Sequence, residues 1–182
     1  ATTSSRTAYG SQQSFTTVSP NPVLSVTTLN SFGAGCLNTA AGPSSFTITG
    51  SNLSSAAVTI AALDGYTYSS TAGGTYTSTL SITQTGGSFS QQVFVKFTPT
   101  AVQSYNGTIS VAGGGVSTAV TVAASGSGIN TAPTVTSGVS SGISGSAATL
   151  AGAITANGCT PISAYGIEYS TTNSFVNGTG TR

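Results

Sequence analysis

The chain is almost without charge. Charged side chains make up 3% of its 182 residues, whereas they make up roughly a quarter of an ordinary soluble protein. Histidine, methionine and tryptophan are absent as well. Without histidine the chain can build neither a histidine-based nucleophile relay nor a histidine-ligated metal site. The composition therefore predicts a protein that is not an enzyme and that holds no cofactor and no metal.

The few charges are also scattered. They are Arg6, Asp64, Lys96, Glu168 and Arg182, with a net charge of +1. This distribution provides no basic stripe for nucleic acid and no polybasic patch for anionic lipid. No apolar run is long enough to cross a bilayer, and no basic-then-apolar signal segment opens the chain. We expect neither nucleic acid binding nor membrane insertion, and the Ser-, Thr-, Gly-, Ala- and Val-rich composition favours an extracellular location, as an internal or matured segment.

Short runs in which apolar and small polar residues alternate fill most of the sequence. Hydrophobic residues make up 37%, and this alternation is typical of strands with one buried face. The runs are too short and too rich in β-branched residues for helices. Predicted strands span residues 23–29, 45–50, 57–61, 77–82, 92–97, 107–111 and 118–122, with turns at Asp64-Gly65, Gly86-Gly87, Asn106-Gly107 and Gly113–Gly115. Seven strands at this spacing predict an all-β, immunoglobulin-like sandwich.

The pattern divides the chain into one complete domain and two partial ones. The complete sandwich is predicted over residues 21–129, where a Ser-Gly-Ser-Gly run at 125–128 ends it. Residues 130–182 then supply only the first strands of a second domain, at residues 134–136, 147–154 and 162–170. Residues 1–20 have the pattern of a last strand, at 7–18, followed by a proline-containing linker. We therefore expect the chain to begin and end inside domains of a tandem array.

Tyr105 follows a polar corner between two predicted strands. In immunoglobulin-like folds a tyrosine at this place buries its ring and hydrogen-bonds to backbone a few residues upstream, which is known as a tyrosine corner. The other interpretation is an ordinary core aromatic. Both roles are structural.

Several of these segments carry a family resemblance. Phe97-Thr98-Pro99-Thr100, Tyr105-Asn106-Gly107-Thr108-Ile109 and the Ser-Gly ending at 125–128 resemble immunoglobulin-like repeats of the abnormal-spindle and hydin group in giant Bacteroidota surface proteins. Pro133-Thr134-Val135-Thr136, Thr149–Gly152 and Tyr165–Ser170 are similar to the first half of fibronectin type III-like repeats, and residues 1–18 to their last strands. The resemblance implies a type nine secretion cargo on the cell surface, such as a long gliding adhesin. The middle of the fibronectin-like repeat is missing, which suggests a fragment.

The two cysteines are predicted to meet. In the expected topology, the loop around Cys36 lies at the pole of the first sandwich that faces the second domain. The loop around Cys159 joins two strands of the second domain and faces back. An interdomain disulfide is therefore geometrically plausible and suits an oxidising compartment. The alternative is two buried thiols, or partners in missing sequence.

Three functional classes remain open from the sequence. The first is a non-catalytic stalk segment of a surface adhesin or fibre, whose partners are neighbouring repeats and whose uncharged sheet edges favour lateral self-association; any glycan would bind at a tip outside this segment. The second is a carbohydrate-binding module, which needs an exposed aromatic platform or an acidic calcium pocket. The third is an accessory module of a secreted enzyme whose catalytic residues lie elsewhere.

Overall fold

The computed structural model describes residues 10–16, 18–176 and 178–181. The described residues contain strands and no helix, as the sequence predicts. The first six strands are β1 (Val23–Val26), β2 (Ala34–Cys36), β3 (Ala41–Leu53), β4 (Val58–Ile60), β5 (Tyr66–Ser69) and β6 (Leu80–Ile82). The other six are β7 (Gly87–Phe97), β8 (Gly107–Gly113), β9 (Val120–Ala124), β10 (Ser127–Ile129), β11 (Thr134–Ser137) and β12 (Gly152–Ala156).

Two four-stranded antiparallel sheets form a sandwich over residues 23–129. One sheet has the strand order β1-β3-β7-β5 and the other β6-β4-β8-β9. Alternate residues point inward, so that Val93, Val95 and Phe97 of β7 are fully buried. They pack against buried aliphatic residues of the facing sheet, such as Ile60 and Ile109. This period of two is the reason that the alternating sequence runs predict most strands of the two sheets.

Aromatic rings fill the end of the sandwich core that lies nearest to β2. The ring of Phe97 lies at its centre, with centroid distances of 5.1 Å to Tyr66, 5.4 Å to Tyr105 and 5.7 Å to Phe32. The Phe97–Tyr105 pair is edge-on, one of the favourable arrangements for aromatic pairs. Four aromatic rings therefore pack together at this end of the core.

One pair of strands is parallel and was not predicted. β10 pairs with β2, and the register matches Gly128 with Gly35 and Ile129 with Cys36. The Ser-Gly run predicted as the end of the domain is therefore partly a strand. Glycine is required there, because a Cβ on Gly126 would lie 2.8 Å from the Phe97 ring and one on Gly128 2.0 Å from the carbonyl oxygen of Ala101.

Several predicted strands differ from the structure in extent. The run at 77–82 contributes only β6 and an isolated bridge from Thr77 to Tyr68. β8 begins at Gly107, as predicted for the strand at 107–111, and Gly113–Gly115 form the predicted turn, each with positive φ. β5 was missed, although its Tyr66-Thr67-Tyr68 sequence alternates.

The C-terminal unit, defined as residues 130–176 and 178–181, is far less regular than the sandwich. Its sheet contains only β11 and β12, paired antiparallel. The predicted strand at 162–170 is wrong: it is reduced to a bridge between Tyr169 and Thr181, because no neighbouring strand supplies backbone partners. The division of the chain into separate domains stays a prediction.

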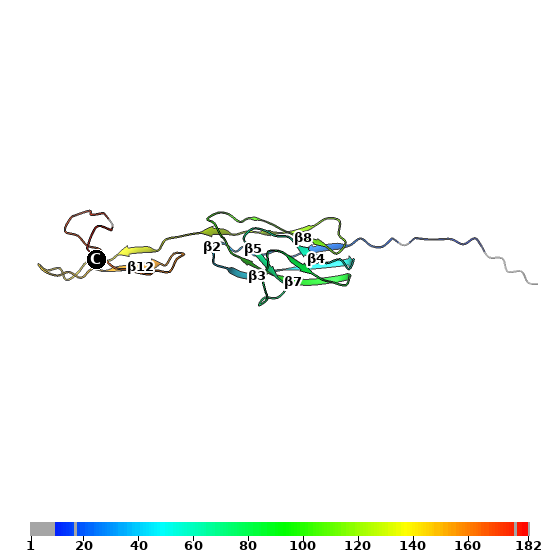
Figure 1. The fold of residues 1–182 in the computed structure, drawn as a ribbon, viewed down its shortest axis with the longest axis horizontal. Helices are drawn as coiled ribbons and strands as arrows, with labels where there is room; N and C mark the ends of the chain where they lie inside the picture. Colours follow the sequence, from blue (N-terminus) through cyan, green and yellow to red (C-terminus); the bar gives the residue numbers. More distant parts are fainter. Residues whose placement is uncertain (1–9, 17, 177, 182) are drawn as a thin grey trace, which may run out of the picture.

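The predicted strand at residues 7–18 is also absent where it can be assessed. Residues 10–16 and 18 are in no strand, and residues 7–9 and 17 lie outside the described residues. Figure 1 shows this segment leaving the sandwich at the end opposite to β12, so that the chain is elongated.

Candidate functional site

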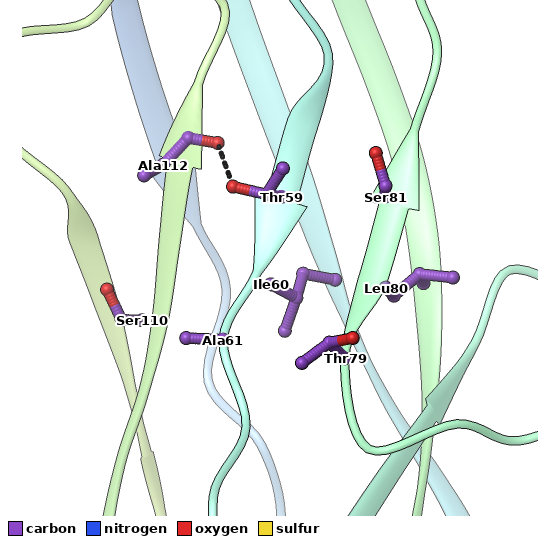
Figure 2. Close-up of a pocket in the computed structure, with 8 residues that line it drawn as sticks. All are labelled: Thr59, Ile60, Ala61, Thr79, Leu80, Ser81, Ser110 and Ala112. Carbon is purple, nitrogen blue, oxygen red and sulfur yellow. Dashed lines mark hydrogen bonds between the residues drawn. The ribbon is translucent and has the colours of Figure 1, made fainter.

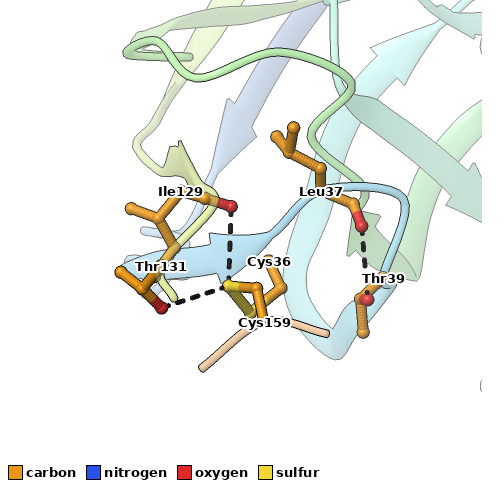
Figure 3. Close-up of a disulfide and its surroundings, with 6 residues drawn as sticks. All are labelled: Cys36, Leu37, Thr39, Ile129, Thr131 and Cys159. Carbon is orange, nitrogen blue, oxygen red and sulfur yellow. Dashed lines mark hydrogen bonds between the residues drawn. A yellow bond between two sulfur atoms is a disulfide. The ribbon is translucent and has the colours of Figure 1, made fainter. Parts of the chain in front are cut away.

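The most specific feature of the molecule is a covalent junction between the sandwich and the C-terminal unit. Cys36 ends β2, and its sulfur is bonded to that of Cys159, which follows β12. The two Cα atoms are 5.3 Å apart although 123 positions separate them in sequence. Figure 3 shows the bond beside the last residues of β10. The structure thus contains the disulfide that the sequence predicts.

The backbone positions both cysteines. On the sandwich side, the Leu37 amide donates a hydrogen bond of 3.2 Å to the carbonyl of Ile129, which extends the β2–β10 pairing past Cys36. On the other side, the Cys159 amide donates one of 2.8 Å to the carbonyl of Thr131 in the connection between the two units. Backbone hydrogen bonds therefore hold the connection at Ile129 and at Thr131, which brings Cys159 next to Cys36.

Gly158 allows the close approach of this loop. Its φ is +69°, and a Cβ there would lie 2.4 Å from the carbonyl oxygen of Thr131. A side chain would both strain the backbone and push the loop away. Sequence reasoning did not single out this glycine, and the Asn-Gly pair before the cysteine is the signal that could have identified it.

The disulfide has a polar shell on one side. Cys159 Sγ lies 3.6 Å from the carbonyl oxygen of Ile129 and 3.5 Å from the hydroxyl of Thr131 (Figure 3). Because a disulfide sulfur carries no hydrogen, the contact with the carbonyl is a packing contact, and the hydroxyl of Thr131 is the group that can donate. Both sulfurs belong to half-buried residues.

Tyr105 is placed close to the same end of the sandwich. Its ring is buried, and its hydroxyl accepts hydrogen bonds from the amides of Thr100 (2.9 Å) and Ala101 (2.8 Å). This is the arrangement of a tyrosine corner, rather than of a core aromatic without polar contacts. The contact with the Thr100 side chain, helped by these amides, lowers the pKa of Tyr105.

Two neighbouring tyrosines differ in how their hydroxyls are satisfied. The Tyr66 hydroxyl donates a hydrogen bond of 3.0 Å to the carbonyl of Tyr105. The Tyr68 hydroxyl is buried and has no hydrogen-bond partner among the described residues. Burial, together with the nearby Tyr66 phenol, raises the pKa of Tyr68; the Leu63 backbone opposes this rise without reaching hydrogen-bond geometry. Neither hydroxyl is placed to act in acid–base chemistry near neutral pH.

Lys96 lies outside the core. It alternates with the buried Val95 and Phe97, and its ammonium lies 4.3 Å from the centroid of the Tyr76 ring. This geometry is that of a cation–π contact. The charge therefore helps to hold the segment around Tyr76 against β7.

Two surface depressions are lined by small, hydroxyl, amide and aliphatic residues. The one in Figure 2 lies over β4, β6 and β8, where the Thr59 hydroxyl donates a 3.5 Å hydrogen bond to the carbonyl of Ala112. Its other lining residues are Ile60, Ala61, Thr79, Leu80, Ser81 and Ser110. No titratable side chain lines it.

The described residues contain no group of three or more His, Cys, Asp or Glu side chains that could hold a metal ion. No helix in the described part of the chain is long and apolar enough to span a membrane. Among the aromatic residues, those of the sandwich core are buried, whereas Phe15, Tyr165 and Tyr169 are exposed outside the sandwich. A search of protein-family models and of curated proteins finds no match to this chain.

Proposed function

We propose that this chain is a non-catalytic structural segment of an extracellular fibre or adhesin stalk, which spaces or displays a binding tip at the cell surface. The observation that carries the proposal is the Cys36–Cys159 bond, because it joins the end of a sandwich to the β unit that follows it. Disulfides of this kind persist in oxidising, extracellular compartments.

Two further observations support this function. The sandwich and the C-terminal unit follow one another along the long axis of the molecule (Figure 1). The connection of residues 130–133 is short, and the disulfide and the Cys159 amide restrict it from the side. A short connection with a lateral covalent bond resists bending, which is the mechanical property that a stalk requires.

The experiment is a comparison of the oxidised chain, the reduced chain and the Cys36→Ser, Cys159→Ser double variant by small-angle X-ray scattering and negative-stain microscopy. We expect one narrow distribution of end-to-end lengths for the oxidised chain and broader, matching distributions for the other two. Equal distributions in all three samples would contradict a stiffening role. Antibody labelling of intact producing cells tests the surface location, and labelling only after permeabilisation would contradict it.

A further inference from the structure

The β11–β12 sheet exposes one cross-strand pair of large apolar side chains. Every residue of both strands is exposed, including Val135 at 69% and its cross-strand partner Ile154 at 39%. Tyr165 beyond them is 87% exposed. An isolated two-stranded sheet is marginal in water, and open strand edges with apolar neighbours attract further strands. The β11–β12 sheet therefore offers a surface to which a further strand can add.

The same chain carries an extended segment that has no partner of its own. Residues 10–16 and 18 belong to no strand, and Phe15 and Val18 are 88% and 90% exposed. Within the described part of the chain these residues make no hydrogen bond. Residues 10–18 contain no proline, so every position can donate a backbone hydrogen bond, whereas Pro20 and Pro22 follow directly and limit pairing.

One molecule cannot bring these two parts together. Figure 1 shows the segment leaving the sandwich at one end of the long axis and β12 at the other end. The whole sandwich lies between them. A second molecule placed end to end, however, presents its N-terminal segment to the C-terminal unit of the first.

Charge does not oppose such a contact. Residues 10–18 carry no charged side chain, and none occurs between Lys96 and Glu168. Strand addition relies on backbone hydrogen bonds, with side chains filling positions on alternate faces. The seven residues 10–16, at about 3.3 Å each, are long enough to pair along the whole of the five-residue β12.

We propose that residues 10–16 of one copy add as a strand to the β11–β12 sheet of the next copy, with Phe15 covering the exposed side chains of Val135 and Ile154. This inference rests on the proposed function, since it names the contact through which stalk segments join end to end. The occupant is a second copy of this chain.

The test is sedimentation velocity of the oxidised 182-residue chain over a range of concentrations, compared with three variants. Phe15→Asp changes the donor segment, Val135→Asp changes the acceptor sheet, and Val102→Asp changes an apolar residue of similar exposure in the β7–β8 connection of the sandwich. We expect the parent chain and Val102→Asp to form concentration-dependent oligomers. The donor variant should associate about tenfold more weakly or worse, because it no longer buries the Phe15 ring.

A mixing experiment distinguishes end-to-end strand addition from nonspecific association. The Phe15→Asp chain keeps an intact acceptor and the Val135→Asp chain keeps an intact donor. Each alone should associate much more weakly than the parent, whereas their mixture should form dimers and no larger oligomers. Because Phe15 is 88% exposed and does not belong to the core cluster of the described residues, its substitution should leave the sandwich folded. Circular dichroism and the intact Cys36–Cys159 bond verify the fold of the acceptor variant.

Three results would overturn the proposal: a parent chain that stays monomeric at high concentration, a Phe15→Asp chain that assembles like the parent, or a mixture that stays monomeric. Assembly that depends on Val135 and not on Phe15 would mean that another segment covers the sheet. None of these results bears on the stalk proposal itself, because the end-to-end length of a single oxidised molecule is measured independently. Association should also be insensitive to salt, since no charges take part.

Discussion

The disulfide should prevent most of the chain from extending under a stretching force, because it closes a loop between Cys36 and Cys159. A pull on the two ends enters through β1 and β2, crosses from Cys36 to Cys159 and leaves through the residues that follow. All strands from β3 to β12 lie in the closed loop between the two cysteines. When the disulfide is intact, unfolding of these strands cannot lengthen the molecule.

The size of this effect follows from the sequence separation. The loop contains 123 residue steps, and an extended chain spans at most about 3.3–3.6 Å per residue, which gives roughly 400 Å of concealed length. In the folded molecule the same two residues lie 5.3 Å apart between their Cα atoms. Reduction should therefore add roughly 400 Å to the fully stretched length.

Single-molecule force spectroscopy measures this quantity directly. The chain is attached through handles at its two ends and is stretched before and after addition of a reductant. The Cys36→Ser variant is the control, and we expect it to behave like the reduced chain under both conditions. Equal contour lengths for the oxidised and the reduced parent would refute the reasoning, because they would show that the closed loop lies outside the path of the force.

The remaining predictions concern stability and are measured by chemical or thermal unfolding. Tyr68→Phe removes a buried hydroxyl without a partner and should stabilise the fold by about 1 kcal/mol. Burial raises the pKa of Tyr68 above its unfolded value of about 10, so the unfolded chain loses this proton first and the stability of the fold falls as the pH rises above about 10. Tyr68→Phe should reduce this alkaline loss. Tyr105→Phe leaves two backbone amides without their acceptor and should lower the melting temperature by several degrees, so an unchanged value would contradict the corner assignment. Gly128→Ala places a Cβ against the Ala101 carbonyl and should destabilise by about 1–3 kcal/mol, whereas Gly73→Ala, with open space around it, should change stability by less than about 0.5 kcal/mol.

Reduction should lower stability in the same assays. Removing a crosslink raises the conformational entropy of the unfolded chain, which typically lowers the free energy of unfolding by about 2–5 kcal/mol. The Cys36→Ser variant should show the same loss without reductant. An oxidised parent no more stable than this variant would mean that the bond does not restrict the unfolded state.

Much of the sandwich could be predicted because each strand alternates apolar and polar residues within its own sequence. In β7, for example, Val93, Val95 and Phe97 alternate with polar residues, and burial of one face of a strand requires this pattern whatever its neighbours are. Lys96 lies between Val95 and Phe97 and faces away from the core for the same reason. The position of Tyr105 after a polar corner likewise indicated its structural role.

Other features depend on neighbours that are distant in sequence. The parallel pairing of β2 with β10 joins segments about ninety positions apart, and the Ser-Gly sequence of β10 has no alternation that could reveal it. Gly126 and Gly128 are fixed by the Phe97 ring and the Ala101 carbonyl, which only the folded chain brings near. The predicted strand at 162–170 was wrong for the opposite reason, since its alternation had no neighbouring strand to pair with.

The sequence by itself determined the all-β class and the scarcity of acid–base groups, because these depend on composition and on period-two alternation. It made the pairing of the two cysteines geometrically plausible, and the structure decided between that pairing and two separate thiols. The tertiary structure decided how the junction is built and which apolar surface stays open. Gly158, the Thr131 carbonyl and β10 meet at the disulfide only after the sandwich has closed. Likewise, Val135 is exposed because the sheet that contains it has two strands, and a local pattern cannot encode the number of neighbours that a strand will find.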